Sequence, residues 1–277
     1  MRKLAIGTVL TGALALTGLA APIASAASPD LTFANVTVNK GKAIVVGTTA
    51  TVKVPVTYTL TRPSDLNIDY KTTFAGITLY RGTLKSPDNG LDPESAPTCT
   101  TTATTDTTVT ASCTETIVVD PQDSLYEAAD ATTWKAAGFY SHVDQDTDDS
   151  DSHVSFDYGY DLWGGLGTAQ VKRAAKLTVN ATPEPVTKGK TLTVKGALTR
   201  ANWETGKYSG YQGQSVTLQF RAKSSSTYKN VKTVTSGTAG ALSTTVKAAA
   251  DGYYRYTFAG TSTTAAKAAA GDYVDVR

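Results

Sequence analysis

Five aspartates lie in one short stretch of the chain, and no other segment resembles a metal-binding site as closely. Asp144, Asp146 and Asp148 alternate as the first three ligands of a helix-loop-helix calcium loop do, because a hard cation needs several converging oxygen ligands. The match then fails, because Asp149 stands where that loop requires glycine and Ser155 where it has a bidentate glutamate. The five carboxylates of the stretch are Asp144, Asp146, Asp148, Asp149 and Asp151.

The two histidines of the chain, His142 and His153, flank this acidic stretch. Imidazole together with carboxylate suits zinc or copper, so a transition-metal site is a second hypothesis. The third is a solvated hairpin loop whose like charges keep a sheet edge soluble, and the departures from the calcium pattern favour this one. Apart from calcium as an open alternative, we expect no cofactor.

Patterns that would indicate catalysis are missing from the sequence. A serine nucleophile needs a neighbouring base, and both imidazoles stand beside the acidic stretch; there is no G-x-S-x-G turn and no H-E-x-x-H helix. Acid pairs such as Asp157 and Asp161 occur, but in an acidic segment such pairs are most often surface charge. We therefore expect that the protein is not an enzyme.

Three aromatic residues, Trp203, Tyr208 and Tyr211, lie close together in a segment that has the composition of a loop. Exposed rings can stack on sugars, so carbohydrate binding is one hypothesis for this segment. Rings in such a loop also commonly cap the core of a sandwich, and this alternative stays open.

Cys99 and Cys113 are the only cysteines, and they flank a threonine-rich segment with a turn expected around Asp106. In an exported chain this arrangement predicts one disulfide that closes a local hairpin, with a contribution of about 3 kcal/mol from loop closure. Neither cysteine stands in a C-x-x-C pair, which argues against a metal or catalytic thiol. The pair indicates an oxidising compartment.

The first 26 residues have the form of a secretory signal peptide, with positive charge at Arg2 and Lys3, an apolar run, and a small-residue site at Ala24-Ser25-Ala26. A retained membrane anchor is the alternative, but the run is short and rich in small residues. We expect a secreted, extracellular protein that is free of the membrane after cleavage of the signal.

Charge is divided unevenly along the rest of the chain. Residues 27–170 hold 8 basic and 19 acidic residues, a formal net charge of −11, whereas residues 171–277 hold 16 basic and 5 acidic residues, a net charge of +11. The basic part therefore indicates docking within the protein, charge that serves solubility alone, or an acidic partner, and we favour the first two over the third.

The basic residues are spread along alternating strands without a Lys/Arg-rich cluster, which argues against recognition of nucleic acid. The remaining partners are an anionic cell-wall polymer, the acidic domain of the same chain, or a second copy of the protein arranged head to tail. The residues that we expect on this basic surface are Lys188, Lys190, Lys195, Arg200, Lys207, Arg221, Lys223, Lys229 and Lys232.

Alternation of apolar and polar residues predicts β-strands throughout. Between Thr51 and Leu60, valine, tyrosine and leucine alternate with threonine, lysine and proline, which is typical of a strand with one buried face. Pro55 cannot donate to a ladder, so we expect an edge strand or a bulge there. The glycine-rich run from Trp163 to Gly167 precedes no helix, and we interpret it as a bend before a strand that leads into the next domain.

The last part of the chain carries a family resemblance. The run LTVNATPEPVTKGKTLTVKGALTR from Leu177, together with QSVTLQF, YKNVKTV and DGYYRYTFAG, resembles the immunoglobulin-like modules of secreted actinobacterial proteins such as those of Streptomyces. In particular, the Gly-x-Tyr of Gly252 to Tyr254 looks like a tyrosine-corner region, which would place Tyr254, Tyr256 and Phe258 on one face.

The resemblance implies an all-β fold of two immunoglobulin-like β-sandwiches in tandem and a location outside the cell, and it carries no catalytic residues. The domains that we expect are the signal peptide at 1–26, an acidic sandwich with one disulfide at 27–170 and a basic sandwich at 171–277. Together these features predict a structural or binding protein at the cell envelope, with a calcium- or carbohydrate-binding module as the alternative.

Overall fold

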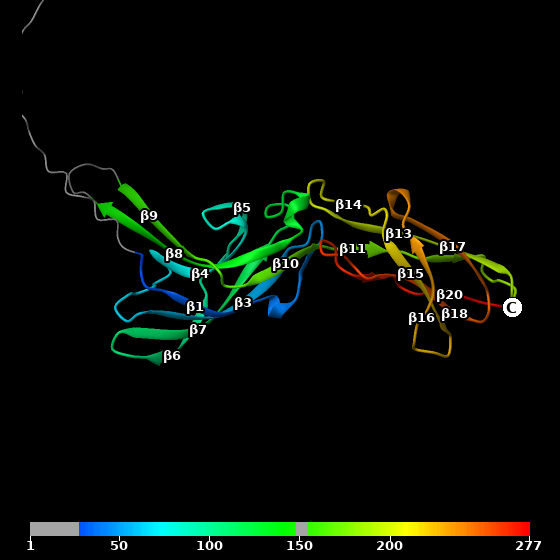
Figure 1. The fold of residues 1–277 in the computed structure, drawn as a ribbon, viewed down its shortest axis with the longest axis horizontal. Coiled ribbons are helices and arrows are strands. Elements are labelled where there is room, and N and C mark those ends of the chain that lie inside the picture. The colour runs from blue at the N-terminus through cyan, green and yellow to red at the C-terminus, as the bar shows by residue number, and fades with distance from the viewer. Residues whose placement is uncertain (1–27, 148–153) are drawn as a thin grey trace, which may run out of the picture.

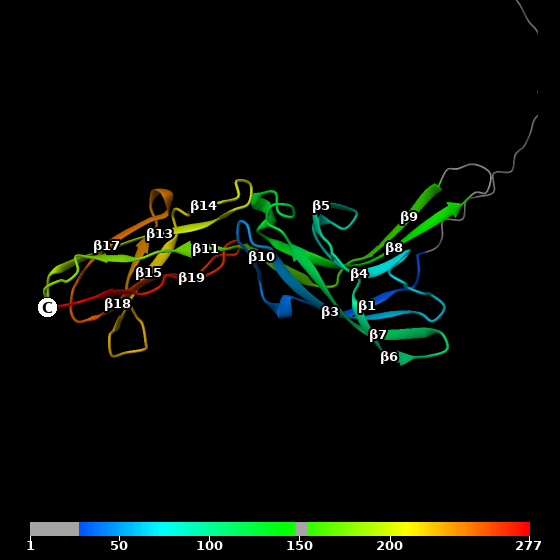
Figure 2. The ribbon, with the colours of Figure 1, turned by 180° about the vertical axis from the view of Figure 1, so that it is seen from behind.

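The computed structural model describes residues 28–147 and 154–277, with side chains described outside 143–159. Figures 1 and 2 show two sandwiches that lie end to end, with β10 and β11 between them and the C-terminus at the far end of the second. Several predicted features lie outside the described residues: the signal peptide over 1–26, Asp148, Asp149, Asp151 and His153, and the side chains of Asp144 and Asp146. Within the described part of the chain, no helix is long and apolar enough to cross a membrane.

Strands β1 to β10 build the first sandwich. One sheet has the order β1-β3-β7-β6, and the facing sheet has the order β2-β10-β8-β4-β5, with β9 also paired to β8. The bounds are β1 Thr32–Val38, β2 Ile44–Val46, β3 Val52–Pro63, β4 Thr73–Thr83, β5 Ser86–Leu91, β6 Thr98–Thr104, β7 Thr108–Val119, β8 Thr133–Thr147, β9 Val154–Trp163 and β10 Thr168–Arg173. Two short 3-10 helices accompany them, η1 Asn39–Gly41 and η2 Ala128–Asp130.

Strands β11 to β20 build the second sandwich. In one sheet β13 pairs with β11, β12, β14 and β17, and the facing sheet has the order β16-β15-β18, with β19 and β20 both paired to β18. The bounds are β11 Ala175–Leu177, β12 Asn180–Thr182, β13 Thr191–Asn202, β14 Lys207–Gly210, β15 Ser215–Ala222, β16 Lys229–Thr235, β17 Ala241–Lys247, β18 Gly252–Phe258, β19 Lys267–Ala268 and β20 Asp272–Val274, with the 3-10 helix η3 Thr238–Gly240 before β17.

The strand order is immunoglobulin-like in both sandwiches, as predicted. In the first, β1-β3-β7-β6 matches the A-B-E-D sheet, and β10-β8-β4 matches G-F-C, with β2 added in parallel to β10. In the second, β12-β13-β17 matches A-B-E, and β15, β18 and β20 match C, F and G, with a parallel bridge from Val186 to Val276. The protein is therefore a tandem of two immunoglobulin-like sandwiches.

The alternating pattern of the sequence explains the two cores. In β3 the residues Val54, Val56, Tyr58 and Leu60 point inward and are almost fully buried, while the threonines between them face outward. The prediction of an edge strand or a bulge at Pro55 is wrong for β3 as a whole, because β3 lies between β1 and β7 and pairs with β7 without a register shift. The ladder with β1 ends at the pair Val38–Val56, so that side of β3 is open where the proline stands.

Two further sequence predictions are confirmed. Cys99 and Cys113 form a disulfide between directly opposite positions of the β6–β7 hairpin. Tyr254, Tyr256 and Phe258 all point into the second core from β18, and the Tyr256 hydroxyl donates across the sandwich to the Val194 carbonyl at 2.9 Å.

The joint between the sandwiches has almost no linker. Ala174 is the single residue between β10, which ends the first sandwich, and β11, which begins the second. Its amide donates to Val46 O of the first sandwich at 2.8 Å, and the neighbouring Arg173 amide donates to Thr263 O of the second at 3.0 Å. Because backbone groups on both sides are satisfied across the joint, the connection is stiff.

Trp203 belongs to the second sandwich by sequence but packs into the core of the first. Its side chain is 5% exposed, and its indole N–H donates to Gly47 O at 2.9 Å. The buried guanidinium of Arg173 lies 5.1 Å from the indole ring, a cation–π contact, while its Nε and Nη2 make no hydrogen bond. Glu204, next to Trp203, accepts a hydrogen bond from the Ala128 amide of the first sandwich at 3.0 Å.

Replacing Trp203, a residue of the second sandwich, with alanine should leave a cavity in the core of the first sandwich. We expect the W203A substitution to lower the free energy of unfolding of the first sandwich by about 3–5 kcal/mol, the range for loss of a buried tryptophan. Chemical denaturation followed by tyrosine fluorescence and circular dichroism measures this change. The matched control is Y126A, which removes a ring that is 62% exposed and should cost less than about 0.5 kcal/mol. A W203A cost similar to that of the control would show that the joint does not stabilise the first sandwich.

Candidate functional site

The structure distributes the nine predicted basic residues over the second sandwich rather than gathering them. Lys195 lies in β13 of one sheet, whereas Lys229 and Lys232 lie on β16 at the edge of the other. Lys188 and Lys190 precede β13 near the C-terminus, where the Lys188 amide donates to Arg277 O. Arg200 and Lys207 lie toward the joint, and Arg200 stacks on Tyr211 at 4.0 Å. The remaining two, Arg221 and Lys223, take part in a local cluster.

This cluster is on the outer face of the sheet formed by β15, β18 and β20, and we call it the Arg–Tyr face. Strand pairing brings its members together: Arg221 stands opposite Tyr253, and Tyr253 stands opposite Tyr273. Tyr228 reaches the same cluster from the loop before β16. The members of the Arg–Tyr face are Arg221, Lys223, Tyr228, Tyr253, Arg255 and Tyr273.

Each cation of the Arg–Tyr face lies against a tyrosine ring. The Arg221 guanidinium is 3.9 Å from the Tyr253 ring and 5.3 Å from the Tyr228 ring. The Arg255 guanidinium lies 3.7 Å from the same Tyr228 ring. Stacking holds a guanidinium plane in place while its N–H groups, which lie in that plane, point past the ring edge.

Hydrogen bonds further fix these side chains without using all their donors. Arg221 donates through Nη1 to Ser225 O at 3.0 Å, and Arg255 donates through Nε to Gln219 Oε1 at 2.9 Å. Each guanidinium has five N–H donors, so the others can meet a carboxylate or a phosphate. The pKa of Lys223 is raised by its hydrogen bond to Tyr273 and, less strongly, by the charge of Asp251, so this lysine stays cationic.

Four of these six residues were not predicted from the sequence. The signal was present in the alternation of β18, where Tyr253 and Arg255 occupy the positions between the buried Gly252, Tyr254 and Tyr256. Period two therefore places them together on the outer face. Tyr228 lies in a loop, and no sequence pattern indicates which strand face such a residue covers.

The three aromatic residues proposed for sugar stacking do not form one exposed surface. Trp203 is buried in the joint, and Tyr208 packs against the first core with the Lys176 ammonium 3.8 Å from its ring. Tyr211 packs against the second core, 5.8 Å from the Phe258 ring. The structure therefore gives two of these rings to one core and the third to the other.

The first two aspartates of the acidic stretch, Asp144 and Asp146, lie in β8. Backbone pairing sets Asp144 opposite Asp157 and Asp146 opposite Ser155. Among the residues that the structure describes, no three His, Cys, Asp or Glu side chains are grouped as metal ligands. Apart from His142, the side chains of the calcium and transition-metal hypotheses lie outside that part, so both stay predictions.

A buried carboxylate, Glu115, is a titratable group that sequence reasoning missed. It projects from β7 into the first core and is 6% exposed. Its Oε1 accepts the Ile77 amide hydrogen at 2.8 Å, and its Oε2 accepts the Tyr58 hydroxyl at 3.2 Å. Because β5 pairs with β4 only from Leu79 onward, the Ile77 amide has no strand partner on that side, and the carboxylate takes its place.

Close approach of the two sheets at Glu115 depends on Gly76. A Cβ at this position would lie 2.7 Å from Glu115 Oε2 and 3.0 Å from Phe139, so a side chain would displace one of them. The alternation of β7 contained the signal for the buried acid, since Cys113, Ile117 and Val119 on the same parity are all buried. Its partners are hydrogen-bond donors and its surroundings are closed, which is typical of a structural carboxylate rather than a catalytic one.

Comparison with known proteins adds little to this description. No family model matches the chain, and no curated protein matches it. Among solved structures, the chain is similar to the full ectodomain of mouse nectin-like molecule 4, with 15% identity, a TM-score of 0.22, and coverage of 87% of this chain and 63% of that one. It is also similar to a multidomain fragment of titin, with 10% identity, a TM-score of 0.23, and coverage of 89% and 68%. The chain thus spans less than two thirds of the nectin-like ectodomain, and scores this low carry no argument about function.

Stability of the first sandwich should depend on pH through Glu115. Burial raises the pKa of Glu115 from its ordinary 4.5 to about 7. Between these values the folded protein holds a proton that the unfolded chain releases, so the free energy of unfolding should fall as pH rises through this window, by about 3 kcal/mol. Denaturation curves measured from pH 4 to 8 test this expectation.

The substitution E115Q should flatten the slope between pH 4.5 and 7, because glutamine keeps an acceptor for the Ile77 amide but does not titrate. The control is E94Q, which neutralises an exposed glutamate and should leave the slope unchanged. An E115Q protein with the slope of the parent would show that another group is responsible.

Proposed function

We propose that the protein is a secreted, non-enzymatic binding module that attaches to anionic polymers of the cell envelope through its Arg–Tyr face. The observation that carries this proposal is that Arg221 and Arg255 both lie against the Tyr228 ring, with Lys223 on the neighbouring Tyr273. Tyrosine and arginine together are the residues most enriched where interfaces gain their binding energy.

The chemistry of this face selects an anion. Planar guanidinium groups match carboxylates and phosphates in a bidentate way, and stacking orders them before the ligand arrives, which lowers the entropy cost of binding. The second sandwich also lies in the part of the chain with a net charge of +11, so a long polyanion is attracted before it contacts any one residue. A wall polymer with repeated phosphate or carboxylate groups fits both features.

Two sequence features support a role outside the cell and without catalysis. The signal peptide and the disulfide between Cys99 and Cys113 fit an exported protein. The buried acid Glu115 is closed off by the core, which supports a structural role for this carboxylate.

Co-sedimentation with purified cell walls at low and high salt tests the proposal. We expect the parent protein to pellet at low salt and to be released as salt rises, because charges beyond about 10 Å are screened at 0.1 M. The double variant R221Q/R255Q should bind at least about tenfold more weakly. The variant R221K/R255K should fall between the two, since lysine keeps the charge but not the stacked plane.

The matched control is K195Q/K247Q, which removes two positive charges from the opposite sheet. It should weaken binding by less than about threefold, as loss of diffuse attraction alone predicts. Equal losses in the control and in R221Q/R255Q would contradict a specific Arg–Tyr face, and an absence of pelleting would contradict wall binding altogether. Thermal unfolding of each variant separates loss of binding from loss of fold.

Head-to-tail association with a second copy is the other candidate, and the opposite charges of the two parts of the chain favour it. Sedimentation equilibrium without cell walls distinguishes the two. A salt-sensitive increase in mass that R221Q/R255Q abolishes would assign the Arg–Tyr face to self-association, and a monomer at all salt concentrations would exclude this candidate.

A further inference from the structure

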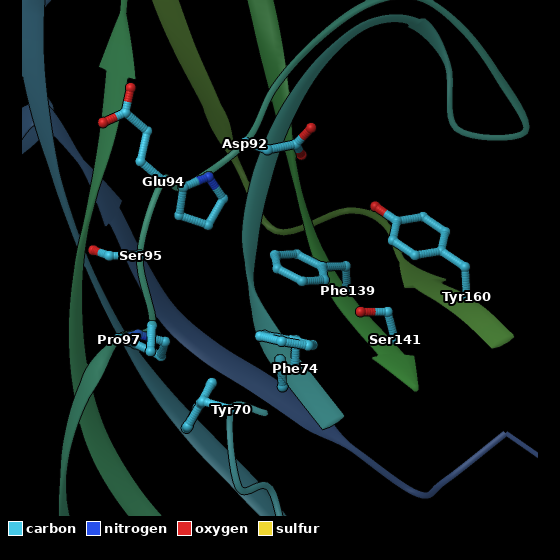
Figure 3. Close-up of a pocket in the computed structure, with 12 residues that line it drawn as sticks. Tyr70, Phe74, Asp92, Glu94, Ser95, Pro97, Phe139, Ser141 and Tyr160 are labelled. Atoms are coloured by element: carbon cyan, nitrogen blue, oxygen red, sulfur yellow. The ribbon is translucent and has the colours of Figure 1, made fainter. Parts of the chain in front are cut away.

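A groove on the first sandwich combines aromatic rings with negative charge, whereas the Arg–Tyr face combines them with positive charge. It runs along the outer face of the sheet formed by β4, β8 and β9, and the segment from Asp92 to Pro97 forms its wall. Its volume is about 340 Å³, and Figure 3 shows the residues that line it. A second hollow of about 310 Å³ continues it past Asp92 and Tyr160.

Four aromatic rings form the floor of this groove in two pairs. The Phe139 and Tyr160 rings are stacked with their centroids 6.1 Å apart, and the Tyr70 and Phe74 rings meet edge to face at 6.5 Å. Strand pairing aligns the rings, since Ser141 of β8 stands opposite both Phe74 and Tyr160. These rings are partly exposed, and Tyr160 is 56% exposed, so they are open to a ligand.

The charge of the groove is negative. Asp92 and Glu94 are the charged residues among those that line it, and both are exposed. In Figure 3, Asp92 lies on the wall above Phe139 and beside Tyr160, whereas Glu94 points away from the rings. The pKa of Tyr160 is raised to about 12, first by burial of its hydroxyl and then by the Asp92 charge, which places that carboxylate within electrostatic reach of the ring.

A cation–π contact already occurs elsewhere on the same sheet face. Farther along it, the Lys135 ammonium lies 5.7 Å from the ring of Tyr80, its partner across β4 and β8. In the described part of the chain, no lysine or arginine stacks on the four rings of the groove. Arg62, whose charge acts on Tyr70, lines a separate hollow. The groove itself therefore offers aromatic faces and a carboxylate, whereas Lys85 lines the hollow that continues it past Asp92 and Tyr160.

We infer that this groove binds an alkylammonium group, with the cation over the Phe139 and Tyr160 rings and its charge paired with Asp92. The negative face of an aromatic ring attracts a cation, and recognition of ammonium ligands by several rings is a general use of this attraction. A neutral sugar would use the rings but gain less from the carboxylate, and an anion would be repelled. The groove lies on the first sandwich, so this inference does not depend on the Arg–Tyr face.

Calorimetric titration of the purified protein with choline tests the inference. The neutral carbon isostere of choline, dimethylbutanol, has the same shape without the charge, and we expect it to bind at least about fivefold more weakly. A parallel titration with Nα-acetyl-lysine amide, whose side-chain ammonium is free, identifies the source of the ligand. Tighter binding of this probe assigns the groove to a lysine of a protein partner, and tighter binding of choline assigns it to a free quaternary ammonium.

Variants locate the site. The substitution D92N should weaken choline binding about fivefold, and F139L should do so to a similar extent, since leucine keeps apolar volume but has no ring face. The control D106N neutralises an exposed aspartate on the β6–β7 turn and should have no effect. Equal binding of choline and dimethylbutanol, equal affinity of D92N and the parent, or an absence of heat with both cations at millimolar concentration would overturn the inference.

Discussion

The insertion of Trp203 into the core of the neighbouring sandwich is the interaction on which the arrangement of the molecule depends. An immunoglobulin-like sandwich normally closes its own ends, and adjacent sandwiches then move on their linker. Here the linker is the single residue Ala174, the indole completes the first core, and the Arg173 guanidinium covers the indole. A buried tryptophan with its N–H satisfied by Gly47 O cannot leave without opening a cavity and exposing a polar group. We therefore expect the two sandwiches to behave as one body.

A rigid joint would keep the acidic and the basic sandwich at a fixed separation. The acidic sandwich presents aromatic rings beside Asp92, and the basic sandwich presents aromatic rings beside Arg221 and Arg255. Both sites lie on the sheet that contains the C and F strands of their sandwich, so equivalent sheets carry charges of opposite sign. A stiff joint keeps each sandwich from folding back onto the other, which would neutralise both faces. Such a molecule can hold an anionic and a cationic group at a fixed separation.

Period-two alternation was sufficient to predict most of the strands, and the resemblance to immunoglobulin-like modules added the two sandwiches and the Tyr254, Tyr256 and Phe258 row. The same alternation places Glu115 among buried positions and Arg255 among exposed ones, although neither residue lies in a strongly charged stretch. Other features could not be predicted because they depend on which loop meets which surface. A tryptophan between two strands has the same local pattern whether it caps its own core or that of a neighbour, and Tyr228 reaches its two arginines only through a loop conformation. The proline at position 55 indicates a missing ladder partner, but local chemistry does not reveal that this results from where β1 stops rather than from an edge strand or a bulge.

The most direct test of the account is a measurement of whether the two sandwiches tumble together in solution. Residual dipolar couplings of the backbone amides, fitted separately for residues 28–147 and for residues 175–277, give one alignment tensor for each sandwich. The account predicts tensors of equal magnitude whose relative orientation matches the structure, because the Trp203 joint is fixed. Tensors of clearly different magnitude would show that the sandwiches move independently, and would contradict the claim that a rigid joint holds the two charged faces apart.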